Sequence, residues 1–188
     1  MTSVCEESHP LEYKWTLYFK KPASQFKGSS STTTKDEWSA LYTEICTVGT
    51  VEQYWTMCHN IPKPSMLPAR TTYYFFKDGI KPAWEDPMNE GGGQVDLKSS
   101  KKTYSINSEI IFFDLLLLTI GNQLPFTEFI CGIGFNKTKD LIEIWTKKDS
   151  PNEKLKDSIF DKINEMLKLR ELPPLESEVI SYYVRKGK

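Results

Sequence analysis

Three tryptophans of this chain stand in settings that make them candidates for ligand binding. Trp38 and Trp84 each lie in a polar stretch without an apolar repeat, and loops that expose bulky aromatic side chains commonly carry binding sites. Glu85 directly follows Trp84 and places a carboxylate beside it. Trp145 and Glu143 alternate with two isoleucines, so we expect both to face away from the core that the isoleucines enter.

This set of side chains suits a flat, positively charged base. A guanine methylated on its imidazole ring is a cation, and stacking it between two indoles gains dispersion and cation–π attraction together. The carboxylate of Glu85 would accept hydrogen bonds from the N1–H group and the exocyclic amine of the base. Neutral guanine would keep those hydrogen bonds and lose the charge attraction. On local context alone, packing and binding explain the two loop tryptophans equally well.

The elements that would position these residues begin with short strands. Alternating or aromatic-rich runs predict strands at residues 13–19, 71–77, 95–97, 129–135, 141–145 and 179–184. Residues 41–48 fit a helix and a strand alike. A long loop over residues 80–93 would hold Trp84 and Glu85.

Three helices are predicted from capping residues and apolar spacing. They are a helix capped by Thr50 and Gln53, a helix from Asn107 or Ser108 to a stop at Gly121, and a helix after a second capping box, Ser150-Pro151-Asn152-Glu153. Their expected buried faces are Val51, Tyr54, Trp55 and Cys58 in the first helix, and Leu155, Ile159, Ile163 and Met166 in the third. Hairpin-joined strands with helices between them predict a mainly antiparallel sheet with helices on one face.

Composition narrows the class of protein. The 188 residues suit a single domain, 1–188, in which we expect residues 1–8 and 27–36 to be flexible. The net charge of −1 argues against a protein that grips long nucleic acid through its phosphates. The four cysteines lack zinc-site spacing, so we expect reduced thiols and no metal. The longest apolar run, 110–120, is too short to cross a bilayer, and we expect a soluble, intracellular protein.

Several motifs together carry a resemblance to a known family. They are His9-Pro10-Leu11, Lys14-Trp15, Thr50-Val51-Glu52-Gln53-Tyr54-Trp55, the stretch from Phe76 to Asp86 that contains Lys81-Pro82-Ala83-Trp84-Glu85, Ile142-Glu143-Ile144-Trp145-Thr146, and Leu172-Pro173-Pro174. From His9 to about Tyr182 the chain resembles the translation initiation factor 4E family, the messenger-RNA cap-binding proteins. The resemblance implies an α+β fold, in which a curved, mainly antiparallel β-sheet carries three α-helices packed on its convex face. It also implies that residues 41–47 form a strand.

The resemblance assigns a role to each candidate cap-binding residue. Trp38 and Trp84 would sandwich the 7-methylguanine, Glu85 would pair with the edge of the base, and Trp145 would lie near the methyl group. Lys137 and Lys139 would hold the phosphates, although a solvated turn also explains them. In this chain Gln94 stands where the family has an arginine and Val95 where it has a tryptophan. Fewer cations should weaken the hold on the triphosphate.

A second site implied by the resemblance lies on the helices. It would bind a scaffold initiation factor 4G-like protein or a 4E-binding protein, through a short helix of the partner. The matching residues are His9, Pro10, Leu11, Val51, Trp55, Phe113, Asp114 and Leu117. This favours a partner surface over the core for Trp55. Capped messenger RNA would be the other partner, with no cofactor, membrane or DNA involved, in the cytoplasm and with the nucleus left open as a second compartment.

Two other function classes compete with a cap-binding factor. An enzyme such as a cap hydrolase would need clustered carboxylates or an activated nucleophile, and only Glu85-Asp86 stands near the expected pocket. A translational repressor or interaction module with weak or lost cap binding would keep the helical surface alone. The chain ends soon after Tyr183, without the long C-terminal loop of the family, so we expect an open site that accepts caps modified on the following nucleotides.

Overall fold

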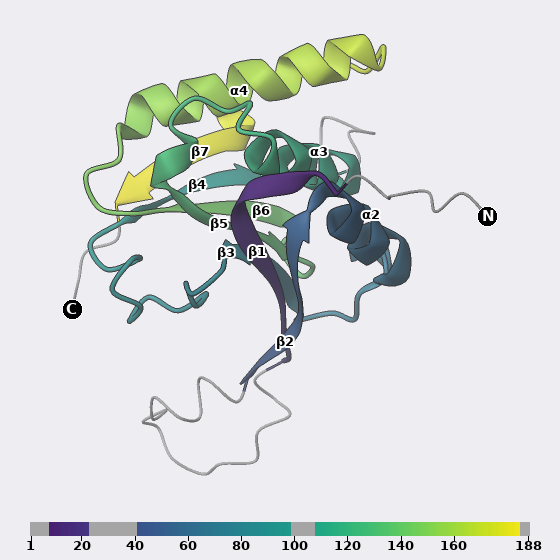
Figure 1. The fold of residues 1–188 in the computed structure, drawn as a ribbon. Helices are drawn as coiled ribbons and strands as arrows, with labels where there is room; N and C mark the ends of the chain where they lie inside the picture. The colour runs from purple at the N-terminus through teal and green to yellow at the C-terminus, as the bar shows by residue number, and fades with distance from the viewer. Residues whose placement is uncertain (1–7, 23–40, 99–107, 185–188) are drawn as a thin grey trace.

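A single antiparallel sheet forms the centre of the structure. The computed structural model describes residues 8–22, 41–98 and 108–184, and within them a seven-stranded sheet has the order β2-β1-β3-β5-β6-β4-β7. The strands are β1 (Pro10–Lys20), β2 (Tyr42–Thr50), β3 (Thr72–Lys77), β4 (Gly93–Lys98), β5 (Ile130–Asn136), β6 (Leu141–Thr146) and β7 (Ile180–Val184). The helices α2 (Val51–Asn60), α3 (Ser108–Ile120) and α4 (Asn152–Leu169) lie on one side of the curved sheet (Figure 1). The predicted fold class is confirmed, and the stretch 41–47 is a strand rather than a helix from Tyr42 onward.

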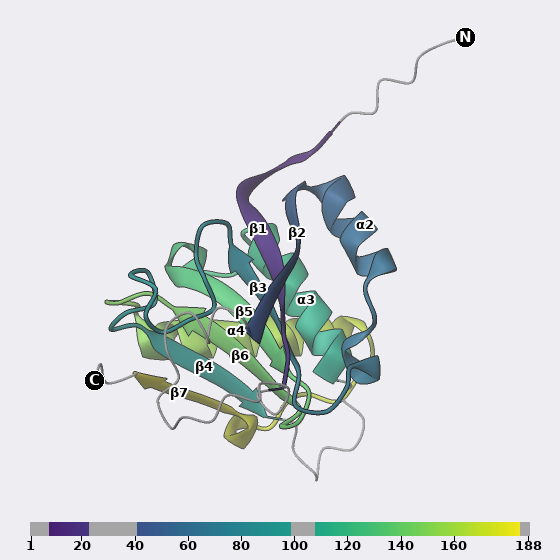
Figure 2. The same cartoon turned by 90° about the horizontal axis from the view of Figure 1, so that it is seen from below.

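The sheet separates two apolar clusters. The helix-side core lies between the sheet and the helices, and Phe75 and Ile144 belong to it. The aromatic cluster lies on the opposite face, which we call the concave face, and consists of Tyr74, Phe76, Ile80, Cys131 and Trp145, with Tyr18, Tyr42 and Trp84 packed against it. Figure 2 shows the sheet from below, with the strands in front of α3 and α4. Trp145 faces away from the helices as predicted, yet its side chain is only 2% exposed.

Strand β5 departs from the predicted alternation. Strict alternation along the predicted strand 129–135 would put Cys131 and Ile133 on one face, but Cys131 belongs to the aromatic cluster and Ile133 to the helix-side core. The pairing of β5 with β6 shifts register between Ile130 and Gly132. An extra residue at such a bulge reverses the facing of its neighbours, and no sequence alternation reveals it.

The start of α2 follows its prediction with one difference. Thr50 is the N-cap, and its hydroxyl accepts a hydrogen bond from the Gln53 backbone N–H at 3.2 Å. The Gln53 side chain does not return to Thr50 but accepts from the backbone N–H of Gly49 at 2.7 Å. The capping therefore joins the end of β2 to the helix and fixes the direction of α2.

Two other predicted helix ends are corrected. The second capping box is wrong, because α4 begins at Asn152 with Pro151 as N-cap, and in the described residues the buried Ser150 hydroxyl has no hydrogen-bond partner. Ser150 thus lies one position too early to cap the helix. Helix α3 does end before Gly121, but the left-handed residue that turns the chain is Asn122, with φ 51°.

The buried helix faces also differ in detail from the prediction. In α2 the buried residues are Tyr54 and Met57, whereas Val51 and Trp55 are exposed. In α4 the predicted Leu155, Ile159 and Ile163 are buried, but Leu167 takes the place expected for Met166. The apolar stripe of α2 is therefore wider than the sheet can cover, and Val51 and Trp55 at its edge are exposed to solvent.

Candidate functional site

Trp84 and Trp145 form a stacked pair on the concave face. Their ring centroids lie 3.4 Å apart with an interplanar angle of 19°. Trp145 is fixed by β6, whereas Trp84 comes from the loop between β3 and β4. The structure therefore brings together two of the three tryptophans predicted to bind the base. Trp38 lies outside the described residues.

The loop that carries Trp84 is held by its own polar side chains. The Asp86 carboxylate accepts hydrogen bonds from the backbone N–H groups of Lys81 and Met88, both at 2.9 Å. The Asn89 amide donates to the carbonyl oxygens of Lys81 and Ala83, both at 2.8 Å. These bonds close the loop on both sides of Trp84-Glu85. Sequence reasoning missed this role of Asp86 and Asn89, although Asp and Asn in a Gly/Pro-rich loop are typical of such turns.

Glycines in β5 leave room for the aromatic cluster. A Cβ atom added at Gly132 would lie 2.2 Å from the ring of Phe76, and one added at Gly134 would lie 2.6 Å from the ring of Tyr74. Both rings contact Trp145 edge-on, with centroid distances of 5.4 Å for Phe76 and 5.9 Å for Tyr74. Side chains at the two glycines would displace these rings, so the glycines determine where Trp145 and its stacked partner lie.

Polar residues continue the concave face beyond the aromatic cluster. Glu143 on β6 is opposite Asp96 on β4, and both side chains are buried. The Trp145 indole N–H and the Tyr74 hydroxyl donate to the same oxygen of Glu143, each at 3.4 Å. The side-chain amide of Gln94 donates to Asp96 at 2.5 Å. We call Gln94, Asp96 and Glu143 the polar strip; it puts carboxyl groups beside the stacked tryptophans.

The remaining predicted cap-binding residues lie in different places. Glu85 is exposed beside Trp84. Lys137 and Lys139 lie in the β5–β6 turn, and since Trp145 is five residues into β6, at about 3.3 Å per residue, the structure does not bring them to it. The Lys137 ammonium donates to the Ser65 carbonyl at 2.9 Å. Lys137 also lines a cavity of about 250 Å³ with Ser65, Ser108, Glu109, Phe135 and Asp140.

The predicted partner residues of α2 form an exposed apolar surface. Trp55 is 44% exposed and Val51 37% exposed. The Trp55 ring stacks against His59, with centroids 6.3 Å apart, and meets the buried Tyr54 edge-on. We call Val51, Trp55 and the adjoining residues 9–11 the dorsal surface. It presents a large aromatic side chain from a rigid element.

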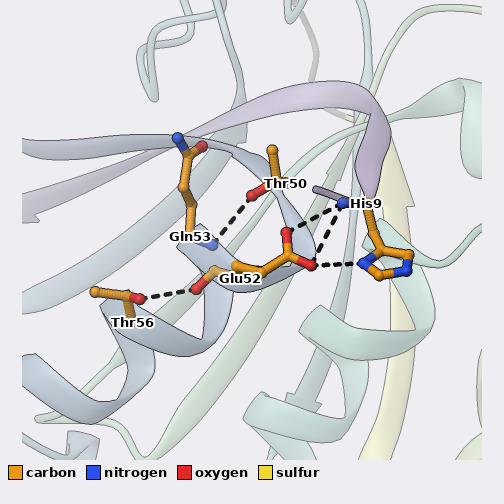
Figure 3. A network of polar contacts seen from close by, with 5 residues as sticks. All are labelled: His9, Thr50, Glu52, Gln53 and Thr56. Carbon is orange, nitrogen blue, oxygen red and sulfur yellow. Dashed lines mark hydrogen bonds and ion pairs between the residues drawn. The ribbon is translucent and has the colours of Figure 1, made fainter. Parts of the chain in front are cut away.

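The N-terminal residues of the dorsal surface are attached to α2 by His9 (Figure 3). The imidazole Nδ1 of His9 contacts the Glu52 carboxylate at 2.6 Å, and the backbone N–H of Val51 donates to the His9 carbonyl at 2.9 Å. The hydrogen bonds from His9 lower the pKa of Glu52 to about 2. Pro10 is exposed and Leu11 half-buried next to this contact.

The α3 residues assigned to the partner site contribute unequally. Phe113 and Leu117 are half-buried and pack against the helix-side core. Asp114 is buried and accepts a hydrogen bond from the Arg170 guanidinium at 2.6 Å. Burial raises the pKa of Asp114, and the neighbouring Arg170 opposes that effect. Asp114 therefore joins α3 to the end of α4, a contact that the sequence did not indicate.

The described residues do not meet the requirements of a membrane-spanning helix or of a metal site held by three side chains. Among the described residues no helix is long and apolar enough to cross a membrane. No group of three or more His, Cys, Asp or Glu side chains in that part of the chain could hold a metal ion.

The fold and the site together define a class of protein. It has an antiparallel sheet that carries helices on one face and a stacked aromatic site on the other. The family model described as "Eukaryotic initiation factor 4E" matches residues 10–187. The chain belongs to the eukaryotic initiation factor 4E family. Members of this family are translation factors rather than enzymes, which removes the cap hydrolase alternative.

Relatives and solved structures agree with this assignment. The chain is 32% identical over 182 residues to a eukaryotic translation initiation factor isoform 4E of Nicotiana tabacum, covering 96% of this chain and 82% of that one. It is 37% identical over 144 residues to eukaryotic translation initiation factor 4E-2 of Schizosaccharomyces pombe, covering 75% of this chain and 55% of that one.

Similar solved structures include complexes with cap ligands. Ascaris suum eIF4E-3 with the m7G cap has a TM-score of 0.74 and 26% identity, and the match covers 96% of this chain and 93% of that one. A schistosome eIF4E in complex with m7GpppA and 4E-BP also has a TM-score of 0.74 and 26% identity, with coverage of 95% and 89%.

Proposed function

We propose that this protein binds the 7-methylguanosine cap of messenger RNA on its concave face and recruits a translation initiation scaffold through its dorsal surface. The stacking of Trp84, on a loop closed by its own hydrogen bonds, against Trp145 of β6 is the observation that carries the proposal. Cap ligands occupy similar proteins of the same family. We further propose that residues 1–188 form one cap-binding domain, which acts in the cytoplasm.

Cap binding would exchange one stacking partner for another. Trp84 would leave the face of Trp145 and stack on the methylated base, with Trp38 on the other side of the base. Glu85 is exposed next to Trp84, so its carboxylate is free to reach the edge of the base. Trp145 would contact the methyl group. The base would take the place of the Trp145 ring against Trp84. Trp84 would therefore stack on an aromatic ring both before and after the cap binds.

Partner binding would use a different physical arrangement. The exposed Trp55 and Val51 offer an apolar strip to an amphipathic helix of a scaffold factor 4G-like protein or a 4E-binding protein. His9, Pro10 and Leu11 adjoin that strip because the His9–Glu52 contact holds them there. Phe113 and Leu117 would widen it. Asp114 would act through its contact with Arg170 rather than by touching the partner.

Titration with cap analogue, followed by intrinsic tryptophan fluorescence, tests the first half of the proposal. Cap analogue should quench the tryptophan fluorescence of the wild-type protein, and the protein should be retained on 7-methylguanosine resin. Both effects should be lost in Trp84→Ala and Glu85→Ala. Trp55→Ala is the matched control, because it removes an indole from the opposite side of the sheet. Saturable quenching that persists in Trp84→Ala would contradict the assignment.

An interaction module that has lost cap binding is the second candidate. The polar strip favours it, since Gln94 and two carboxyl groups lie where a phosphate chain leaving Trp145 along β4 and β6 would pass. Such a protein would bind the partner peptide with wild-type strength and show no quenching by cap analogue.

A further inference from the structure

Glu143 occupies an unusual position for a carboxylate. It lies in the middle of β6 between two isoleucines of the helix-side core, and its side chain is 7% exposed. Burying a carboxylate is unfavourable because charge is removed from water, so its contacts must offset that loss. Its burial on the concave face, next to the proposed base site, therefore invites a functional explanation.

The contacts of Glu143 tie it to the aromatic cluster. One carboxylate oxygen accepts from the Trp145 indole N–H and from the Tyr74 hydroxyl, each at 3.4 Å. The face of the same Trp145 ring carries Trp84. Glu143 thus holds the edge of the ring on which Trp84 stacks, and its carboxyl group lies at one side of the stacked pair.

The opposite strand places a second carboxyl group beside Glu143. Asp96 is directly opposite in the β4–β6 pairing and 5% exposed. The three cross-strand pairs follow in order, first Gln94 with Trp145, then Asp96 with Glu143, then Lys98 with Leu141. A phosphate chain that left Trp145 along these strands would meet the two carboxyl groups before it reached Lys98.

We propose that Glu143 is a specificity-determining residue of this site, which orients Trp145 and makes the concave face select a positively charged, methylated base while gaining little from the phosphates. The inference rests on the proposed cap binding and adds the chemistry that the site prefers. A negative charge near the base attracts the methylated ring and leaves neutral guanine unaffected. The same charge repels phosphates, so added phosphates strengthen binding less than they would in a site without carboxyl groups.

Glu143→Gln tests the charge while keeping an oxygen that accepts from the indole and the hydroxyl. The dissociation constants of 7-methylguanosine mono-, di- and triphosphate and of unmethylated guanosine triphosphate would be measured by fluorescence at low and moderate salt. We expect the preference for the methylated triphosphate over the unmethylated one to fall by about threefold to tenfold. We expect the gain from monophosphate to triphosphate to rise by a similar factor, most clearly at low salt.

Two further variants separate charge from positioning. Asp96→Asn removes the neighbouring charge without touching Trp145. It should shift the methylation preference and the gain from added phosphates in the same directions as Glu143→Gln, but by less. It also serves as the test should Glu143→Gln not fold. Tyr74→Phe removes one donor and keeps the carboxylate, so absolute affinities should fall while both ratios stay near wild type.

The outcomes distinguish this inference from the function on which it rests. Ratios that are unchanged in both Glu143→Gln and Asp96→Asn overturn the role of Glu143 and leave cap binding standing. A wild-type protein that binds no methylated nucleotide overturns both.

Discussion

Trp55 and Trp84 are the partly exposed tryptophans of two different surfaces, and their settings are opposite. Trp55 projects from a helix whose first turn is capped by Thr50, and its ring rests on His59 one turn later. Trp84 projects from a loop and stacks one face on Trp145. In the proposed function the dorsal surface would accept a partner as it stands, whereas the concave face would have to separate two indoles before a base could enter.

The sheet keeps the two surfaces apart. Alternate residues of β3 send Phe75 to the helix side and Phe76 to the concave side. The side chains around Trp55 and those around Trp84 therefore lie on opposite faces of the sheet. A substitution of either tryptophan leaves the side chains of the other surface in place. We expect the two binding activities to be separable by single substitutions, and the following predictions test that separation.

Trp84→Ala should have the largest effect. Loss of the stacking indole should weaken cap-analogue binding by about 100-fold, since stacking and cation–π attraction together supply about 2–4 kcal/mol. Partner-peptide affinity should stay within about twofold of wild type, because additivity holds for distant sites. Fluorescence titration and calorimetry measure the two. Met88→Ala, an exposed change in the same loop, is the control, and an equal loss in that variant would point to general loop damage.

Trp55→Ala should produce the converse result. Aromatic side chains at the centre of an interface commonly contribute about 2 kcal/mol or more, so we expect a 4E-binding peptide to bind at least about 30-fold more weakly. Cap-analogue binding should be unchanged. Thr56→Ala, on another side of the same exposed helix turn, is the matched control. A loss of cap binding in Trp55→Ala would mean that the two surfaces are coupled through the sheet.

Local patterns predicted most of the architecture. The strand predicted at residues 13–19 is β1, whose alternate residues Trp15 and Leu17 lie in the core, and the alternation in β6 predicted that Trp145 faces away from the helices. The capping pair at Thr50 located the start of α2. Each of these depends on residues within one element, where the period of side chains along a strand or helix decides the outcome.

Other parts of the site depend on contacts between distant residues and could not be predicted. Lys137 was expected at the phosphates, but its ammonium reaches Ser65, which is 72 positions away in the chain. Asp114 was assigned to the partner surface, and the structure shows that it pairs with Arg170 from the end of α4. A charged side chain takes whichever partner the folded chain brings near, and sequence spacing carries no information on that choice. The Trp84–Trp145 stack is of the same kind.

Lys77 offers a test within the sheet that separates the two surfaces. It is buried at the end of β3, its ammonium donates to the Thr127 carbonyl at 3.0 Å and lies 4.0 Å from the centroid of the Tyr13 ring. Burial, with a contribution from Lys147, lowers the pKa of Lys77 to about 8. The unfolded chain therefore binds more protons between about pH 8 and the ordinary lysine pKa of about 10.4, and stability should rise with pH across that window.

Lys77→Met should remove this rise. Denaturant unfolding at pH 7 and pH 10 should show a gain of about 1–3 kcal/mol in the wild type relative to the variant. Lys98→Met, at an exposed position, controls for the titration of ordinary lysines. Identical pH profiles for wild type and Lys77→Met would show that burial of the ammonium has no energetic consequence.

The smallest effect is expected at the His9–Glu52 contact, which is exposed and therefore screened. Because the folded-state pKa of Glu52 is lowered to about 2, its contribution is present above the ordinary glutamate pKa and is lost as pH falls toward 2. Glu52→Gln should abolish that dependence and speed hydrogen exchange at the Val51 amide, which donates to the His9 carbonyl. Partner-peptide affinity should fall by at most about twofold. A larger loss would mean that the dorsal surface is organised by its N-terminal segment rather than by α2. The dorsal surface would then depend on a rearranging segment, as the concave face does, and the contrast between the two surfaces would disappear.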